Sequence, residues 1–141
     1  LPAVAAFRPD AVVLQCGSDA VGDDPQSGLA LSNGALWAVV TALKAMTSRF
    51  LVTGGGGYNP WSVGRAWAGV WAALCDRDIP DVLPTEAEAV LRALVWPHAR
   101  RGRNPPEHWF TTLQDAPHHG DIRENVRARV ARLEARLRPW V

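Results

Sequence analysis

Two short segments place a side chain capable of chemistry just beyond an apolar run. "AVVLQCG" (11–17) is followed closely by Asp19, and "RFLVTGG" (49–55) leads through the glycine run 54–57 to Tyr58, the only tyrosine in the chain. A carboxylate can bind a hard metal ion, act as a general base or cap a turn. A tyrosine hydroxyl can donate a hydrogen bond to an oxyanion. Both runs are typical of buried parallel strands, whose carboxyl ends share one sheet edge, so Asp19 and Tyr58 should face one cleft.

The glycine run at 54–57 needs a reason, because glycine is the residue whose ordering costs the most entropy. A Walker-type phosphate loop requires a lysine and then a serine or threonine after its last glycine, whereas Tyr58 and Asn59 follow here. The dinucleotide fingerprint is met only loosely, as any glycine run meets it. A flexible linker is disfavoured by the tightly flanking apolar segments. The run therefore indicates close approach of the backbone to a ligand or a neighbouring strand.

Helices are expected over 33–47 and 59–76, one after each strand. Asn59 is a plausible N-cap and Pro60 suits the first helical position. The second helix carries apolar residues at spacings of three and four, which predict one buried face: Val63, Trp67, Val70, Trp71 and Leu74. Strand, helix, strand and helix form a right-handed βαβ arrangement, so the sequence predicts an α/β fold with a parallel sheet flanked by helices.

The second half of the chain carries weaker signals. A helix is predicted over 85–95, with Thr85 and Glu88 in a capping box. The proline-rich stretch 97–121 is interpreted as a surface loop, with His98 and His108 as surface residues. A last helix from about 121 to 137 has an apolar stripe formed by Ile122, Val126, Val130, Leu133 and Leu137.

Composition narrows the classes of protein and of partner. The chain has 141 residues, is 48% hydrophobic and 21% charged, and carries a net charge of +1, so disorder is disfavoured and nothing indicates nucleic acid or an acidic membrane as partner. No apolar run approaches the roughly 20 residues that span a bilayer. Cys16 and Cys75 lie in apolar surroundings, which predicts buried thiols in a reducing, cytoplasmic location. The opening "LPAVAAFRPD" resembles the end of an element already under way, so the protein is expected to begin upstream.

The motifs together resemble those of a known family. "VVLQCGSD", then "GDDP", then "LVTGGGGYNPWSVGRAW" resemble the carboxy-terminal part of the histone deacetylase superfamily, and most of all its bacterial acetoin-utilisation and acetylpolyamine amidohydrolase branches. The resemblance implies the arginase/deacetylase α/β fold, incomplete in this chain. Residues 1–76 would form a βαβα catalytic part and residues 77–141 a helical and loop carboxy-terminal part.

The resemblance also implies roles for individual residues. Asp19 matches an aspartate ligand of the catalytic divalent metal, zinc or another ion such as Fe²⁺. Tyr58 matches the catalytic tyrosine, whose hydroxyl polarises the acyl carbonyl. Gly55, Gly56 and Gly57 match the turn that lines the substrate channel, with Gly56 expected to touch substrate. The reaction would be metal-assisted hydrolysis that releases acetate from an acetylated lysine peptide or a small acetylated amine.

Other parts of the family's site are expected upstream of this sequence. These are a D-x-H pair of metal ligands and a histidine dyad that serves as general base and acid. The pair His118–His119 lies on the wrong side of both motifs to be that dyad. The chain alone is therefore expected to bind metal poorly and to be inactive, with a zinc-dependent deacetylase as the full-length protein. The rival hypothesis is a non-enzymatic module that binds a nucleotide or anion at the glycine-rich turn before the helix 59–76. The oligomeric state is left open.

Overall fold

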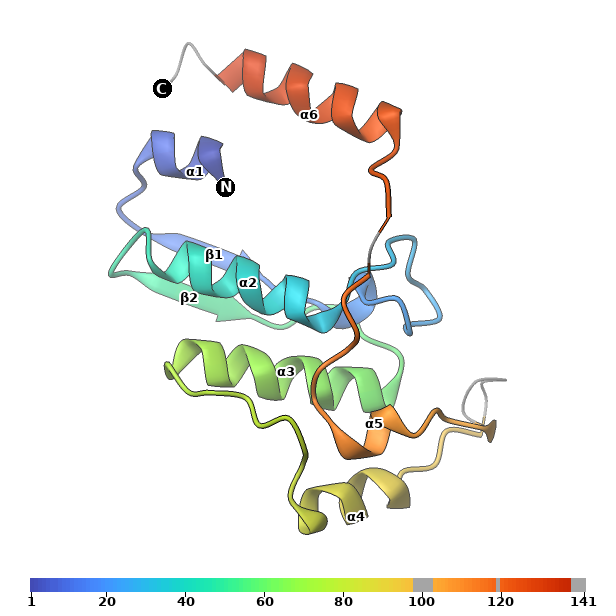
Figure 1. Ribbon diagram of the computed structural model, residues 1–141. Coiled ribbons are helices and arrows are strands. Elements are labelled where there is room, and N and C mark those ends of the chain that lie inside the picture. Colours follow the sequence, from blue (N-terminus) through green and yellow to red (C-terminus); the bar gives the residue numbers. More distant parts are fainter. Residues whose placement is uncertain (98–102, 119, 138–141) are drawn as a thin grey trace.

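The fold is built around one parallel strand pair and the helices that follow each strand. The computed structural model describes residues 1–97, 103–118 and 120–137. Strands β1 (Val12–Gln15) and β2 (Phe50–Thr53) pair in parallel and in register, with Val12 opposite Phe50. Helix α2 (Asn33–Lys44) connects them and α3 (Pro60–Leu74) follows β2, as Figure 1 shows. The predicted α/β class, the parallel sheet and the βαβ connection are confirmed.

Helices α2 and α3 cover only one face of the two strands. Leu14 and Val52 occupy paired positions and pack with the buried residues of α2 and α3. The other face carries the paired residues Val13 and Leu51, which are 68% and 57% exposed. The burial expected of these two apolar runs therefore holds for one face only, because no described element covers the second face.

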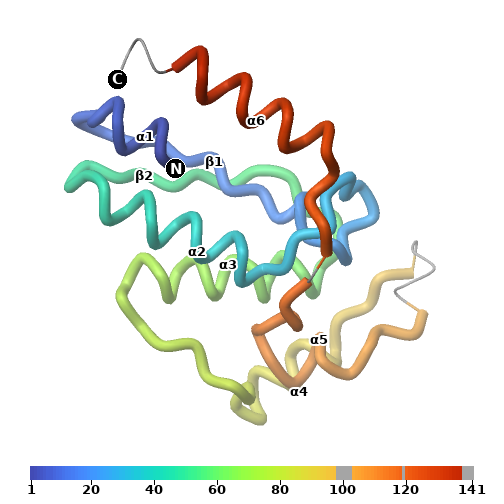
Figure 2. The backbone as a smooth tube through the Cα atoms, turned by 45° about the horizontal axis from the view of Figure 1, so that its top comes forward, coloured from blue at the N-terminus to red at the C-terminus, as the bar shows by residue number. Residues whose placement is uncertain are grey.

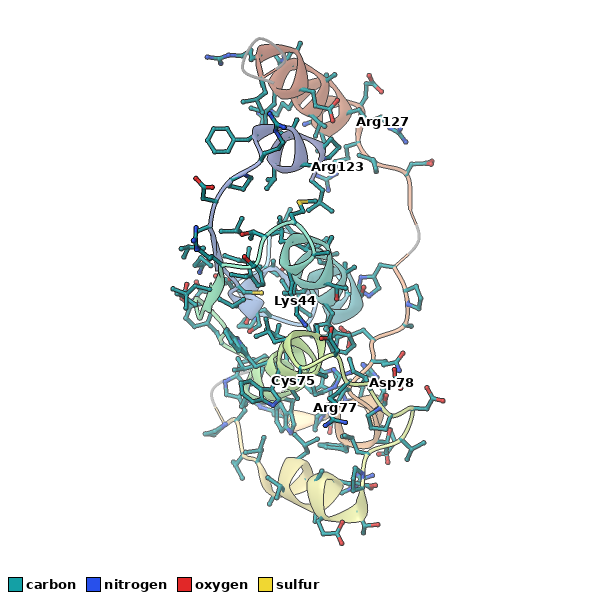
Figure 3. All side chains as sticks on the ribbon, turned by 90° about the vertical axis from the view of Figure 1, so that its left-hand side faces the viewer. Lys44, Cys75, Arg77, Asp78, Arg123 and Arg127 are labelled. Atoms are coloured by element: carbon teal, nitrogen blue, oxygen red, sulfur yellow. The ribbon has the colours of Figure 1, made fainter. Side chains whose placement is uncertain are left out.

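A tryptophan and a glycine set the contact between α2 and α3. The indole Nε1 of Trp37 donates to the carbonyl of Ala66 over 2.9 Å. A Cβ added at Gly69 would overlap the Trp37 ring, so only glycine lets the two helices approach this closely. At the far end of α3, Lys44 Nζ donates to the carbonyl of Leu74 over 2.8 Å. Figure 3 shows Lys44 between the ribbons of α2 and α3.

The buried face of α3 is wider than its apolar pattern predicted. Val70 is fully buried as expected, whereas Trp71 is exposed. The buried positions also include the aromatic Trp61 and the small or polar residues Ser62, Arg65, Ala66 and Gly69. The helix packs against α2 on one side and a later segment on the other, so its buried positions spread beyond a single apolar stripe.

The predicted surface loop over 97–121 contains part of the core, so that prediction was wrong. Its residues 108–111 form the short helix α5 (His108–Thr111), in which Trp109 and Phe110 are buried. The ring of Trp109 lies 5.4 Å from that of Trp61, centroid to centroid. This aromatic cluster attaches α5 to the start of α3.

Helix α4 (Thr85–Ala93) confirms a helix near its predicted place but not its predicted cap. Pro84 occupies the N-cap position and no side chain caps the helix. Glu88 is instead paired with Arg92 one turn later, over 2.7 Å. The capping box read from Thr85 and Glu88 was wrong because the helix begins at Thr85 itself, one residue too early for it to act as the cap.

Two helices near the chain ends lie on the outside of the molecule. Helix α1 (Pro2–Phe7) precedes β1, and the carboxyl-terminal end of α6 (Glu124–Leu137) lies near it in both Figure 1 and Figure 2. The helix predicted over 121–137 is confirmed, but most of its apolar stripe is exposed, at Ile122, Val126, Val130 and Leu133. Among the described residues, no helix is long and apolar enough to cross a membrane.

Candidate functional site

The candidate site lies where β1 and β2 end at the same edge. A short 3₁₀ turn, η1 (Ser18–Ala20), follows β1 and contains Asp19, while the glycine run follows β2. Main-chain pairing continues beyond the strands, because the amide of Ser18 donates to the carbonyl of Gly56 over 2.8 Å. The predicted convergence of the two strand ends is confirmed, and it rests on direct pairing of the strands.

The turn needs glycines because β1 and the residues just after it lie too close to leave room for side chains. A Cβ at Gly56 would lie 2.7 Å from the carboxyl carbon of Asp19. A Cβ at Gly55 would lie 2.9 Å from the Cα of Gly17, and one at Gly57 would overlap the hydroxyl of Ser18. The sequence left open whether the glycines let the backbone approach a ligand or a neighbouring strand. The structure shows close approach to the neighbouring strand and the residues that follow it.

The carboxylate of Asp19 is half-buried and lies directly against the backbone of Gly56. Within the described part of the chain, no hydrogen bond or ion pair engages this carboxylate. An oxygen donor without a competing partner suits one coordination position of zinc or another divalent metal. No described group of three potential ligands includes Asp19, so the residues present account for one ligand of such a site.

One group of three potential metal ligands does occur among the described residues, and it lies elsewhere. Asp23, His108 and Asp115 place ligand atoms within 4.8 Å of one another. However, Asp115 is paired with Arg65 over 2.7 Å, and an oxygen of Asp23 accepts from the indole of Trp109 over 2.8 Å. Because two of its three members are already engaged by protein donors, the group acts as part of the structural network.

Tyr58 is held by its main chain and leaves its ring accessible. The Tyr58 amide donates to Oδ2 of Asp24 over 2.6 Å, and the side chain is 48% exposed. Asn59 caps α3 as predicted, since its Oδ1 accepts from the amides of Trp61 and Ser62 over 3.1 and 3.3 Å. The tyrosine thus stands between the glycine turn and a capped helix.

Asp24 does more than its sequence context indicated. With Asp23 it directly precedes Pro25, a context typical of a turn, and its Oδ1 accepts from the amide of Gln26 over 2.9 Å. Its second bond, to the Tyr58 amide 34 residues away, was not predicted. No pattern in one sequence reveals such a bond, because it depends on how the loop after β1 folds back.

Neither of the two histidines that the structure describes takes part in the candidate site. His108 and His118 are exposed, and Nδ1 of His118 lies 2.6 Å from the carbonyl oxygen of Ala30. His98 and His119 fall outside the described residues.

Comparison with known proteins decides the family. The model of the histone deacetylase domain matches residues 1–74, slightly over half of the chain. The chain belongs to the histone deacetylase family. The superfamily resemblance seen in the motifs is thereby confirmed.

Individual relatives agree with that assignment. Histone deacetylase 1 of Homo sapiens is 38% identical over 78 residues, which are 55% of this chain and 16% of the relative. Histone deacetylase 9 of Arabidopsis thaliana is 36% identical over 81 residues, 57% of this chain and 19% of the relative. The chain thus spans less than a fifth of the length of these histone deacetylases.

Two solved structures share the fold. A crystal structure of a histone deacetylase homologue complexed with SAHA has a TM-score of 0.77 at 23% identity, covering 92% of this chain and 37% of that one. A homologue from Aquifex aeolicus has a TM-score of 0.76 at 24% identity, covering 92% and 36%. The protein therefore has part of the deacetylase fold.

Proposed function

We propose that the protein functions as a metal-dependent amidohydrolase that removes acetyl groups from acetylated lysine or small acetylated amines. One observation carries the proposal. At the shared edge of β1 and β2, the carboxylate of Asp19 is free of described partners and lies against Gly56, two residues before the accessible Tyr58. Family membership adds the reaction class to this geometry.

Each residue would have a defined task. Asp19 would hold one position of a zinc or other divalent ion, which when bound supplies Lewis-acid polarisation of the acyl oxygen. The Tyr58 hydroxyl would donate a hydrogen bond to that oxygen as negative charge develops on it. The backbone of the turn at Gly55, Gly56 and Gly57 would line the path of the acyl group, because it carries no side chain to obstruct it.

The remaining groups would have to come from outside the residues that the structure describes. Of the ligands and the general base that such a reaction needs, the described residues offer near the turn the unengaged carboxylate of Asp19, because the carboxylate of Asp24 already accepts from two amides. We therefore propose that activity belongs to the complete protein and that this chain alone has none.

The rival anion-binding function is disfavoured by the cap of α3. A helix N-terminus binds an anion through free amides of its first turn. Here the side chain of Asn59 already accepts from the amides of Trp61 and Ser62. These two donors are therefore not free for a nucleotide phosphate.

The test uses the complete protein with an acetylated lysine peptide and an acetylated polyamine as substrates. Tyr58→Phe removes only a hydroxyl, so kcat should fall by about 10² to 10³ while metal content and thermal stability stay as they were. Asp19→Ala should lower both metal content, measured by elemental analysis, and turnover. Full activity of either variant on both substrates would refute the assignment, and an anion site made of backbone amides would respond to neither change.

A further inference from the structure

Asp24 is a buried acid that joins the loop after β1 to the residue proposed as catalytic. The residue is only 3% exposed. One carboxylate oxygen accepts from the Tyr58 amide over 2.6 Å, and the other accepts from the Gln26 amide over 2.9 Å. We propose that Asp24 is a positioning residue for Tyr58, an inference that rests on the proposed function.

The glycine turn cannot hold Tyr58 in place by itself. The four residues before it, 54–57, have no side chains with which to pack, and glycine backbone has the most freedom to lose on ordering. The ring of Tyr58 is half-exposed, so its own packing fixes little. The hydrogen bond from the Tyr58 amide to Asp24, directly beside the Cα of Tyr58, is then the main constraint on where the tyrosine side chain points.

The chemistry of this bond suits a positioning role. A carboxylate that accepts from a backbone amide forms a charge-assisted hydrogen bond, which is shorter and stronger than a neutral one. Burial of an ionised group is favourable only where its oxygens are satisfied, and both oxygens of Asp24 have an amide donor. Movement of Tyr58 would leave one oxygen of a buried charge without its donor.

A second hydrogen bond joins the same loop and turn next to the bond between Asp24 and Tyr58. Nδ2 of Asn59 donates to the carbonyl of Asp23 over 3.0 Å. Two consecutive residues of the loop, Asp23 and Asp24, are thus bound to two consecutive residues of the turn, Tyr58 and Asn59. The bond from Asn59 holds the start of α3, and the bond from Tyr58 to Asp24 holds the residue before that start. The orientation of the Tyr58 ring therefore depends on the bond to Asp24.

The first experiment measures the bond without any activity. Because Tyr58 is the only tyrosine, the chain labelled with ¹⁵N-tyrosine gives one amide signal in an NMR spectrum. In Asp24→Asn the amide proton should move upfield and its hydrogen exchange should accelerate about tenfold or more, since local opening becomes easier. Asp23→Asn, the same substitution one residue earlier, removes the charge from the group that accepts from the Trp109 indole and should leave the Tyr58 signal in place.

The possible outcomes distinguish a specific effect of Asp24 on Tyr58 from a general disturbance of the loop after β1. An unchanged signal in Asp24→Asn, or an equal change in Asp23→Asn, would overturn the inference. The unsubstituted chain provides a check that needs no variant to fold. If its Tyr58 amide exchanged at the rate of an unstructured peptide, the bond to Asp24 would not exist in solution and the inference would fail.

The second experiment asks whether Asp24 acts through the tyrosine. In the complete protein, Asp24→Asn should lower kcat about tenfold with little change in KM, and should add no further loss in a Tyr58→Phe background. Additive losses would show that Asp24 acts independently of the hydroxyl and would overturn the inference. Absence of deacetylase activity in the unsubstituted protein would instead refute the proposed function, and the NMR measurement would still decide whether Asp24 positions Tyr58.

Discussion

Arg65 and Asp115 form a buried ion pair in which Nη2 and Oδ1 lie 2.7 Å apart and the side chains are 1% and 7% exposed. The pair joins α3 to the segment after α5. Asp115 also accepts from the amide of Asn33 over 2.9 Å, and Nε of Arg65 donates to the carbonyl of Thr112 over 2.8 Å. Three parts of the chain far apart in sequence are therefore held by two charged side chains, and α3 is fixed at its second turn, one turn beyond the end that meets the candidate site.

The first prediction concerns the loss of this pair. Arg65→Ala should lower the free energy of unfolding by about 3–5 kcal/mol, because it leaves the Asp115 carboxylate buried without its cation. Urea denaturation followed by tryptophan fluorescence measures the change. Arg92→Ala is the matched control, since Arg92 pairs with Glu88 and Glu107 at the surface and its loss should shift the midpoint only slightly. Equal shifts in the two variants would contradict the importance of the buried pair.

Gly56→Ala tests the contact between the turn and the candidate metal ligand. The new methyl group would overlap the Asp19 carboxylate, so one of the two must move. In the complete protein, metal content and turnover should both fall, as measured by elemental analysis and an acetyl-lysine assay. Gly28→Ala is the control, because a Cβ there meets nothing within 4 Å. Retention of metal and activity in Gly56→Ala would show that the carboxylate is not needed at this position.

Local signals in the sequence were sufficient for the part of the fold that positions the site. Both strands are short apolar runs bounded by turn residues, and Asn59 with Pro60 marks the start of α3. The βαβ connection then has one favoured hand, which brings the strand ends together. Asp19 and the glycine turn could therefore be placed at one edge without any structure.

Elements stabilised by distant contacts could not be found in this way. Helix α5 lies in a proline-rich stretch without periodicity and owes its burial to Trp61, about 50 residues earlier. The bond between Asp24 and Tyr58 and the pair of Arg65 with Asp115 depend likewise on tertiary approach. The exposure of Trp71 has the same origin, since helix periodicity identifies an apolar face but not which neighbours are present to cover it.

A pair of glycines on α3 tests how closely α2 and α3 are packed. Gly69→Ala places a methyl group in the ring of Trp37 and should lower the free energy of unfolding by about 1–3 kcal/mol, as expected for overpacking. Gly64→Ala on the same helix meets nothing within 4 Å and should raise it by about 0.5–1 kcal/mol, because alanine favours helix over glycine. Thermal or urea denaturation measures both. Changes of the same sign would contradict the packing described for Gly69.

The last prediction concerns the two thiols, which are both free but differ in environment. The expectation that both are buried was wrong for Cys75, which is exposed just after α3. Burial raises the pKa of the Cys16 thiol above its ordinary value of about 9. In the native chain a thiol reagent should therefore modify Cys75 rapidly and Cys16 only on the timescale of unfolding.

The raised pKa of Cys16 also fixes a pH dependence of stability. Above about pH 9 the thiol ionises in the unfolded chain first, so the folded state binds more protons and the free energy of unfolding falls as pH rises. Denaturation at a series of pH values between about 8 and 10 should show this fall in the native chain and in Cys75→Ala. In Cys16→Ala the fall should be smaller, since no buried thiol remains to resist ionisation. An identical pH dependence in Cys16→Ala and Cys75→Ala would contradict the assignment to Cys16.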